Sequence, residues 1–330
     1  MKMRRSTAFL GAILLCVVSA LLSLCLGSVR LNLAQLLQAV TGGAQGVAGT
    51  IFWYTRVPRS LACLLAGAGL ACAGCILQSV LGNRLASPGL VGINAGAGLG
   101  VTLCCAAGLY SGWVSAFSAF CGAVAAVSVV VLLAQKHGAS RITVILSGVA
   151  MSSILTALSD AVTTLFPDAG MLGGDFRVGG FSSVSMARLI PAGILILLSL
   201  ALCMTLCNEL DVLSLGEETA QSLGLSVAAV RNGFLLLAAL LAGASVSFAG
   251  LLGFVGLLIP HAARRLVGAE ARFLLPMSAL LGAGFVTLCD LAARLVFAPY
   301  ELPVGILLSL IGGPFFMLLL FQRKGGHQRA

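Results

Sequence analysis

"SLACLLAGAGLACAGCILQSVL", residues 60–81, contains no charged side chain and decides the fold of this 330-residue chain. An α-helix rises about 1.5 Å per residue, so a helix of this length crosses the hydrocarbon core of a bilayer, which is about 30 Å thick. Its many glycines and alanines allow close approach of helix backbones, which matters where lipid supplies no hydrophobic drive for packing. The stretch therefore predicts a membrane-spanning helix that packs against other helices.

The composition of the whole chain indicates a polytopic membrane protein. Hydrophobic residues make up 59% of the sequence, charged residues only 9%, and the mean hydropathy is +1.10, whereas soluble domains have about 25% charged residues. The apolar stretches exceed the alternating segments of a membrane β-barrel, so helices are expected. The eleven cysteines are scattered, and Cys72 and Cys75 fall inside the 60–81 helix. This placement favours small packing residues over a disulfide framework or a metal site.

Apolar runs of about twenty residues predict ten membrane spans in all. The first follows a basic N-terminus, and its apolar run is longer than the core of a signal peptide. The eighth has only about twelve apolar residues before Pro260, so we expect a short or broken helix buried among its neighbours. The predicted spans are 8–28, 60–81, 89–108, 113–134, 142–165, 187–207, 230–249, 251–266, 273–297 and 303–321.

Ten crossings place both termini on the same side, and the basic residues indicate which side. Because lysine and arginine are enriched in cytoplasmic loops, the side that holds thirteen of them, against six opposite, is predicted to be cytoplasmic. The net charge of +9 then reflects topology rather than binding to nucleic acid. The predicted cytoplasmic group is Lys2, Arg4, Arg5, Arg84, Lys136, Arg141, Arg231, Arg264, Arg265, Arg272, Arg323, Lys324 and Arg329. The outer group is Arg30, Arg56, Arg59, Arg177, Arg188 and Arg294.

An internal echo predicts two related halves within a single domain, residues 1–330. "LAGAGLACAG" (65–74) and "LAGASVSFAG" (241–250) match at six of ten positions. The predicted topology runs the first stretch inward and the second outward. An inverted repeat of roughly 56–165 and 230–321 follows, as in many transporters, with chance similarity between glycine- and alanine-rich helices as the alternative.

A short acidic segment interrupts the apolar sequence between spans six and seven. Four of the ten acidic residues fall within positions 209–218, beside "LGEETAQSLGL" (215–225). Ser214 and Glu217 have the spacing of a capping box, and Gly224 suits a C-terminal cap, so a two-turn helix is expected. Its apolar face would carry Leu215, Thr219, Ala220 and Leu223, and its opposite face Glu217, Glu218 and Gln221. Because so short a helix is marginal alone, it must rest on the bundle as a connector or be gripped by a cytoplasmic partner.

Three stretches, in order, resemble the permease subunits of ABC importers for iron-siderophores, haem and cobalamin. The first, similar to the family's R-x-P-R … Q-x-x-x-x-N-x-L-A-x-P region, is "RVPRSLACLLAGAGLACAGCILQSVLGNRLASPGLVGINAGA" (56–97). The second, similar to F-V-G-L-x-x-P-H-x-x-R, is "GLLGFVGLLIPHAARRLVG" (250–268). The third, similar to D-x-x-A-R … E-L-P-V-G-I, is "CDLAARLVFAPYELPVGILLSLIGGPFF" (289–316). One departure is Phe176, where the family commonly has tryptophan.

The resemblance implies a ten-helix subunit that dimerises with itself or with a paralogous permease in a bacterial cytoplasmic membrane. Its cargo would be an iron-siderophore, haem or cobalamin-type chelate. Cytoplasmic ABC ATPase subunits would grip Leu215, Gly216, Glu217, Ala220, Leu223 and Gly224. An extracytoplasmic solute-binding protein would dock on Arg56, Arg59 and Arg294. For Arg294 the alternative is a pair with Asp290 one turn earlier, and for Arg56 and Arg59 it is snorkelling toward the membrane surface.

The sequence contains no pattern for catalysis, a cofactor or a metal. A P-loop needs a lysine after a glycine, and none of the three lysines follows a glycine, so ATP hydrolysis must come from a partner subunit. His261, after Pro260, is expected to order the break at the eighth span rather than to bind metal. An intramembrane enzyme would need a catalytic cluster, and the sequence offers none.

Asp160 lies within span five, where an ionisable group is a functional candidate. We expect it to line the transport path or to pair helices. The alternative function is an ion-gradient-driven secondary transporter, which would need relays of titratable groups across the spans. Such groups are nearly missing from this chain, and that mechanism gives no role to the acidic segment.

Overall fold

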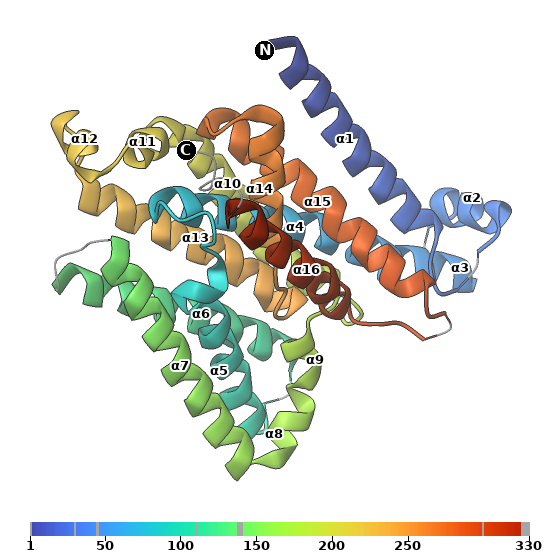
Figure 1. The fold of residues 1–330 in the computed structure, drawn as a ribbon. Coiled ribbons are helices and arrows are strands. Elements are labelled where there is room, and N and C mark those ends of the chain that lie inside the picture. Colours follow the sequence, from blue (N-terminus) through green and yellow to red (C-terminus); the bar gives the residue numbers. More distant parts are fainter. Residues whose placement is uncertain are drawn as a thin grey trace.

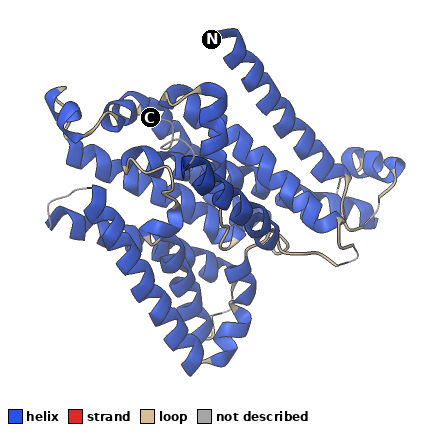
Figure 2. Cartoon of the chain, viewed as in Figure 1, coloured by secondary structure: helices blue, strands red, loops and turns tan. Residues whose placement is uncertain are grey.

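The computed structural model describes residues 2–29, 31–43, 46–109, 111–136, 141–298 and 300–324. Every regular element among these residues is a helix (Figure 2), which confirms the predicted all-α membrane fold. Arg30 and Arg329 from the charge count lie outside the described residues.

Ten helices correspond to the ten predicted spans. Within the described residues, seven segments are long and apolar enough to cross a membrane, and α5 and α16 contribute shorter apolar stretches. The ten are α1 (Lys2–Cys25), α4 (Val57–Val80), α5 (Ile93–Ala106), α6 (Gly112–Lys136), α7 (Arg141–Leu165), α10 (Met186–Thr205), α13 (Val227–Ala249), α14 (Val255–Val267), α15 (Ala271–Leu295) and α16 (Val304–Lys324). Short elements connect them: α2 (Leu33–Thr41), α3 (Gly46–Thr50), the π-helix η1 (Ile51–Arg56), the 3₁₀-helix η2 (Pro88–Val91), α8 (Pro167–Leu172), α9 (Gly174–Val178), α11 (Cys207–Ser214) and α12 (Glu217–Ser222).

Helix α4, which contains most of the 60–81 stretch, lies at the centre of the molecule, behind α16 and between α13 and α15 (Figure 1). Most of its side chains are buried. A Cβ atom at Gly67 would collide with the carbonyl oxygen of Gly282 on α15, and one at Gly74 would collide with that of Gly256 on α14. Glycine at these positions lets α4 pack directly on two neighbouring backbones.

Helices α4 and α13 cross at positions that the sequence echo aligns. Gly69 of α4 lies against the Ser245 side chain of α13, and these residues share the 176-residue offset of the echo. The aligned glycines Gly67 and Gly243 both lie at close contacts with a neighbouring helix. Gly67 packs on α15, and Gly243 packs on Ala123 of α6. The two helices run in opposite directions (Figure 1).

Helix α14 is short and starts inside the bundle, as predicted for the eighth span. It has thirteen residues, or about 20 Å of helix. The irregular backbone before it is satisfied by protein groups, since the Leu251 amide donates to the carbonyl of Phe176 at 2.9 Å. Phe254 enters the helix with a left-handed φ of 63°, and its ring fills the space beside Gly312 of α16. Burial inside protein is what permits this break at membrane depth.

Charged residues collect at two opposite ends of the bundle. At the end that carries α12, upper left in Figure 1, Arg5 of α1 binds Glu270 at 3.0 Å. At the end that carries α9, Arg294 of α15 donates to Ser23 of α1 at 2.8 Å. Arg141 and Arg231 likewise meet Glu217 of α12, whereas Arg59 shares Asp290 with Arg294. The two ends are called below the α12 end and the α9 end.

Candidate docking, coupling and translocation sites

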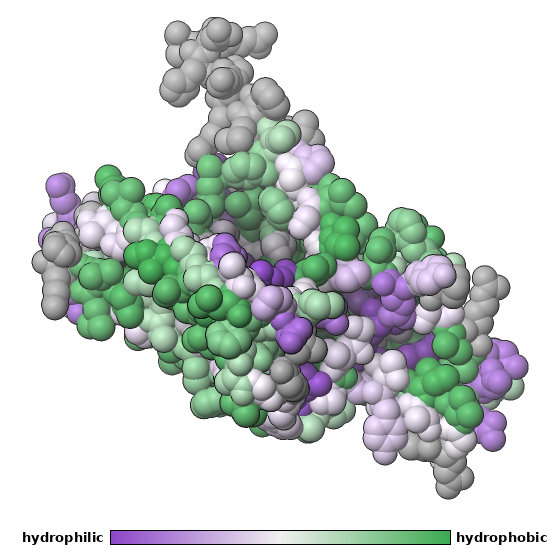
Figure 3. Space-filling view, turned by 90° about the horizontal axis from the view of Figure 1, so that it is seen from below, coloured by the Kyte–Doolittle hydropathy of each residue, from purple (hydrophilic) through white to green (hydrophobic). Residues whose placement is uncertain are grey.

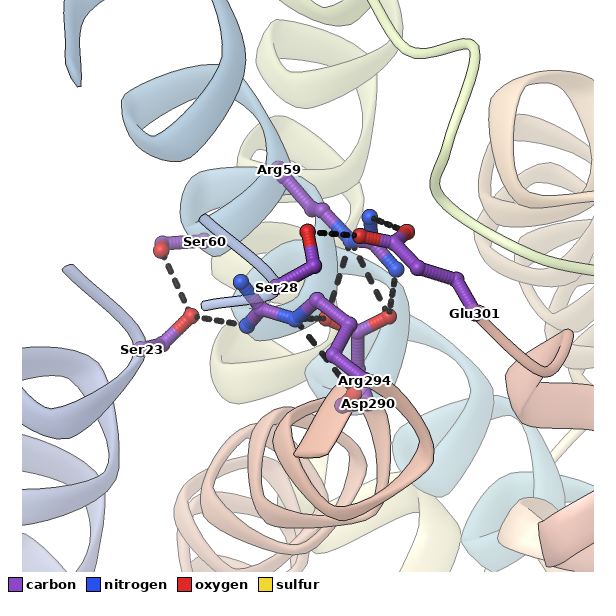
Figure 4. A network of polar contacts seen from close by, with 7 residues as sticks. All are labelled: Ser23, Ser28, Arg59, Ser60, Asp290, Arg294 and Glu301. Atoms are coloured by element: carbon purple, nitrogen blue, oxygen red, sulfur yellow. Dashed lines mark hydrogen bonds and ion pairs between the residues drawn. The ribbon is translucent and has the colours of Figure 1, made fainter. Parts of the chain in front are cut away.

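Arg59 and Asp290 form a buried ion pair between α4 and α15 (Figure 4). Arg59 is the third residue of α4, and Asp290 lies near the end of α15. The Nη2 of Arg59 lies 3.0 Å from Oδ1 of Asp290, and Nε donates to Oδ2 and Oδ1 at 3.1 and 3.2 Å. A planar guanidinium thus engages both oxygens of the carboxylate, which fixes the two helix ends relative to each other.

Two further residues extend this pair into a charge cluster, defined as Arg59, Asp290, Arg294 and Glu301 (Figure 4). Arg294 Nε lies 3.0 Å from Asp290 Oδ2, and Arg59 Nη1 lies 2.6 Å from Glu301 Oε2. Two cations therefore face two anions, as buried charges require. Serine hydroxyls complete the arrangement: Ser23 accepts from Arg294, Ser28 donates to Glu301 at 2.6 Å, and Ser60 shares a hydrogen bond with Ser23 at 2.7 Å.

Glu301, in the segment between α15 and α16, is the accessible member of the charge cluster. Its side chain is 30% exposed, whereas that of Asp290 is fully buried. Burial raises the pKa of the Glu301 carboxyl, but hydrogen bonds from Ser28 and Arg59 outweigh it and hold the pKa below its ordinary value. Glu301 is therefore charged at neutral pH.

Arg56 caps the end of α1. Its Nη1 donates to the carbonyls of Leu24 and Cys25 at 2.7 and 2.6 Å, and Nη2 donates to that of Val29 at 2.7 Å. These carbonyls lack helical partners, so a cation there satisfies acceptors and complements the helix dipole. Sequence reasoning did not anticipate this structural role for Arg56.

The three arginines predicted to dock a solute-binding protein come together at the α9 end. Their guanidinium groups already make hydrogen bonds or ion pairs with other residues of the same chain. All three are nearly fully buried. The pairing of Arg294 with Asp290 that the sequence offered as an alternative is present. Arg56 and Arg59 point into the bundle rather than along a membrane surface. A docking partner would therefore have to compete with contacts that the chain itself makes.

Helix α12 forms in the acidic segment, but its N-terminus differs from the prediction. Ser214 is the last residue of α11, and its hydroxyl donates to the carbonyl of Asp211 at 2.7 Å. The N-cap is Gly216, so the predicted capping box of Ser214 with Glu217 is wrong. The reason is tertiary: Leu213 is buried in the core and extends α11. The chain then turns at Gly216, whose φ of 116° favours glycine.

The C-terminus of α12 follows the prediction for Gly224. This glycine has a φ of 82°, and its amide donates to the carbonyl of Gln221 at 2.9 Å. The amide of Leu225 donates to the carbonyl of Ala220 at 3.0 Å. The two bonds form a Schellman motif, which closes the helix within two turns.

The predicted faces of α12 are divided differently in the structure. Ala220 is buried against the bundle, whereas Leu215 and Leu223 are each 63% exposed. Glu217, predicted to face away from the apolar side, turns inward and accepts from Arg231 Nη1 at 2.9 Å, with Arg141 Nε 3.8 Å away. The buried guanidinium of Arg231, on α13, is what draws the carboxylate inward. Helix α12 is thus anchored through Glu217 and Ala220, and the exposed Leu215 and Leu223 flank its two ends.

Asp160 lines a polar groove between α5, α7, α9 and α16. One cavity of about 360 Å³ is lined by Asn94 of α5, Arg177 of α9 and a row of α7 residues, Ser152, Thr156 and Asp160. A second cavity of about 550 Å³ shares Asn94 and Arg177 and adds Gly305 and Ser309 of α16. Figure 3 shows hydrophilic surface near the middle of this face and again toward its right, with mainly apolar surface on the left. We call the two cavities together the polar groove.

Asn94 and Arg177 are groove residues that sequence reasoning missed as site residues. A usable signal was present on α7, where Ser152, Thr156 and Asp160 recur at four-residue spacing and so share one helix face. A polar stripe on a membrane helix indicates a surface turned away from lipid. Nothing in the local sequence places Arg177 opposite that stripe, because α9 reaches it only through the tertiary fold.

The cysteine pair and His261 take packing positions. Cys72 and Cys75 are fully buried in α4, and the Cys72 thiol lies 3.4 Å from the carbonyl of Leu275. The His261 ring contacts Phe315 of α16 edge to face, with centroids 6.0 Å apart. Across the described residues, no group of three histidine, cysteine or acidic side chains could hold a metal ion.

Comparison with known proteins gives a consistent result over nearly the whole chain. The model of the FecCD transport family matches residues 14–322. The chain is 39% identical to the Fe(3+)-citrate import system permease YfmE of Bacillus subtilis, with 80% of each chain covered. It is 34% identical to the hemin transport system permease HmuU of Yersinia pestis (94% of each chain). It is also 34% identical to the ferric enterobactin permease FepD of Escherichia coli (98% of this chain, 97% of that one).

A solved structure agrees in fold as well as in sequence. It is described as a metal-chelate type ABC transporter in an inward-facing conformation, with a TM-score of 0.86 and 30% identity over 96% of this chain and 99% of that chain. The resemblance drawn from the three motifs is therefore confirmed. Because the family model matches residues 14–322, which include all three motifs, the chain belongs to the FecCD transport family.

Proposed function

We propose that this chain is the membrane permease subunit of an ATP-driven importer that moves an iron-siderophore, haem or cobalamin-type chelate into the cytoplasm. The observation that carries the proposal is the joint agreement of sequence and fold with a metal-chelate type ABC transporter over nearly the full length. The polar groove supplies a route through an otherwise apolar bundle. The chain is not itself the ATPase, since it lacks the lysine-bearing P-loop that nucleotide binding requires.

Helix α12 is the proposed contact for a cytoplasmic ABC ATPase subunit. Leu215 and Leu223 supply an exposed apolar pair of the kind that a partner groove covers. The helix packs against the bundle through the buried Ala220, and it begins after Gly216 and ends before Gly224. Movement of α12 would be passed on through Glu217, because that carboxylate touches Arg141 at the start of α7 and Arg231 near the start of α13. Since α7 lines the polar groove, this contact links the ATPase to the transport path.

The α12 end is proposed to face the cytoplasm, with both chain termini on that side. The larger basic group lies there, which agrees with the enrichment of arginine and lysine in cytoplasmic loops. The α9 end would then face outward, in the cytoplasmic membrane of a bacterium, where a solute-binding protein can reach it. Docking there would use Arg56, Arg59 and Arg294, with an acidic residue of the partner competing with Glu301 for Arg59.

A second permease subunit, identical or paralogous, is proposed to complete the path. The polar groove is open along one side, and the helices beside it expose large apolar side chains, among them Leu146 and Ile154 of α7 and Leu310 and Met317 of α16. A membrane protein buries a polar groove by facing it toward another subunit, because lipid cannot satisfy its polar groups. Asp160, Asn94 and Arg177 would then line the shared path.

The two halves of the domain are proposed to be an inverted repeat. Support comes from the antiparallel crossing of α4 and α13 at Gly69 and Ser245, which occupy aligned positions. It also comes from the two short helices, α5 and α14, each of which follows a crossing helix and starts after an irregular segment. Such symmetry places the substrate path between the halves.

The proposal is tested by reconstituting the chain into proteoliposomes with its partner ATPase and solute-binding protein. Uptake of a radiolabelled ferric chelate should require ATP, the ATPase and the binding protein together. The alternative, an ion-gradient-driven transporter, predicts uptake by this chain alone when a proton or sodium gradient is imposed. Gradient-driven uptake without ATPase would overturn the proposal.

A further inference from the structure

A third cavity, of about 290 Å³, lies at the α12 end and is lined largely by cationic side chains. Arg84 reaches it from the segment between α4 and η2, and His261, Arg264 and Arg265 reach it from α14. Ala269 completes the lining. We call this the arginine cavity. It contrasts with the polar groove, whose lining contains one cation, Arg177, and one anion, Asp160.

Arg264 is held toward the cavity by a fixed neutral partner. Its Nη1 donates to Oε1 of Gln78, and Gln78 is itself buried in α4. The Nε2 of Gln78 donates to the carbonyl of Gly256 at 3.1 Å, which fixes the amide so that its oxygen faces Arg264. The guanidinium is thus oriented by a second residue, as is usual for binding groups that must be held in place before a ligand arrives.

Two of the arginines that line the cavity, Arg84 and Arg264, have no acidic partner among the described residues. Arg84 is exposed and makes no hydrogen bond or ion pair there, and Arg264 has a neutral partner. The acidic residue next to the cavity in sequence, Glu270, is occupied by Arg5 at 3.0 Å and Arg272 at 2.5 Å. Arg264 is half-buried, and a half-buried cation without a counter-charge is costly. A bound anion would relieve that cost.

Membrane topology explains only part of this arrangement. Arginines in the last turn of α14 complement the helix dipole and suit a cytoplasmic loop. Neither reason requires Arg84, which comes from a different segment, to meet Arg264 around one cavity. The convergence of separate segments on a shared space is what distinguishes a binding site from a row of surface charges.

The arginine cavity lies near the middle of α16, farther along that helix than the polar groove. Gly305 and Ser309, in the first turns of α16, line the groove. Phe315, farther along, packs on His261 of the cavity lining. Cargo that enters at the groove and follows α16 toward the α12 end would therefore reach the arginine cavity.

We propose that the arginine cavity receives an anionic group of the cargo, so that the transported chelate carries net negative charge, as ferric complexes of carboxylates or catecholates do. This inference rests on the proposed function and narrows its substrate class. Fixed guanidinium groups suit such oxygens because they donate paired N–H groups and keep their charge at any physiological pH. Neutral hydroxamate chelates would gain nothing from them.

Binding of ferric citrate to the purified permease, measured by equilibrium dialysis with radiolabelled iron, tests this proposal. Arg84→Gln should weaken binding up to about fivefold, the effect of losing one solvent-exposed charge pair, while Arg84→Lys should retain most of it. Arg272→Gln is the matched control, because it removes a charge at the same end but outside the cavity, and it should bind as the wild type does. Equal binding by wild type and Arg84→Gln would overturn the proposal.

Uptake by the complete reconstituted transporter separates failure of this inference from failure of the proposed function. ATP-dependent uptake of anionic ferric chelates, reduced by Arg84→Gln but not by Arg272→Gln, supports both. ATP-dependent uptake of a neutral hydroxamate chelate in preference to anionic ones, unaffected by Arg84→Gln, overturns the anionic assignment and leaves the importer function standing. Absence of ATP-dependent uptake for every chelate counts against the importer function itself.

Discussion

Arg59 and Asp290 are 231 residues apart in the chain, yet the guanidinium of one engages both carboxylate oxygens of the other inside the bundle. This contact joins the start of α4 to the end of α15. Because Arg294 binds the same carboxylate, Asp290 neutralises two buried arginines at once. The α9 end of the molecule is therefore organised around one acidic side chain.

Replacing Asp290 should destabilise the protein strongly. In Asp290→Asn, Arg59 and Arg294 lose their shared counter-charge while remaining buried, and removing one partner of a buried pair costs about 3–5 kcal/mol. Thermal unfolding of the purified permease in detergent should show this loss. Glu301→Gln is the control, because that side chain is partly exposed and an exposed pair contributes about 1 kcal/mol or less. Equal melting of Asp290→Asn and wild type would contradict the structural role given to the pair.

Freeing Arg59 should strengthen docking of the solute-binding protein if that arginine is a docking residue. In Glu301→Gln the competing carboxylate is gone, so we expect a severalfold gain in affinity for the binding protein, measured with permease in nanodiscs. The pKa of Glu301 lies below its ordinary value, so its stabilising contact is present at neutral pH and is lost only as pH falls through that lowered pKa. The wild-type affinity should accordingly stay constant between about pH 6 and 8. A loss of affinity in Glu301→Gln would instead assign docking to Glu301 itself.

Charging the exposed face of α12 should release the ATPase. Leu215→Asp with Leu223→Asp places two carboxylates where an apolar contact is proposed, so the ATPase subunit should no longer co-purify, while membrane insertion is unchanged. Gln221→Glu adds charge on an exposed position of the same helix and serves as the control, with co-purification retained. Undiminished co-purification of the double variant would remove α12 from the coupling role.

Breaking the link from α12 to the bundle should uncouple hydrolysis from transport. Glu217→Gln removes the charge that meets Arg231 and Arg141 but leaves Leu215 and Leu223 in place. The ATPase should still bind and hydrolyse ATP, whereas chelate uptake per ATP should fall severalfold. Glu217→Asp should keep part of the coupling. A proportional fall in ATPase binding and uptake would indicate a simple docking contact instead.

The polar stripe of α7 should be accessible to water. Thr156→Cys, in a variant without the native cysteines, should react with a membrane-impermeant thiol reagent, because thiolates form in water and not in lipid. Ile154→Cys lies on a different side of the same helix, where the exposed surface is apolar, and should stay unlabelled. Addition of the loaded binding protein should protect Thr156→Cys. Equal labelling of both positions would argue against a groove on this face.

The membrane fold could be predicted from the sequence because its cause is local. The uncharged run at residues 60–81 must form a helix in lipid, since only internal hydrogen bonds can satisfy its backbone there. The break before α14 was also predictable, because too few apolar residues precede Pro260 to cross a bilayer. The Gly224 cap followed from a local rule as well, since a helix end favours glycine where φ is positive.

The predictions that failed concern groups whose partners lie elsewhere in the chain. Ser214 fits a capping box by spacing, but burial of Leu213 extends α11 through it. Glu217 fits an outward face by periodicity, but Arg231 draws it inward. The capping contact that Arg56 makes with α1 likewise could not be seen in the local sequence, while its docking role stays a prediction.

The sequence by itself determined where the chain crosses the membrane, which segments are charged, and the transporter family to which it belongs. Only the tertiary structure decided which charged side chains form pairs and whether the leucines that flank α12 stay exposed. It also brought Arg84 and Arg264 to the same cavity. Helix formation in lipid depends on a contiguous stretch of residues. The pairing of charges depends instead on which helix ends the packing of α4, α13 and α15 brings together.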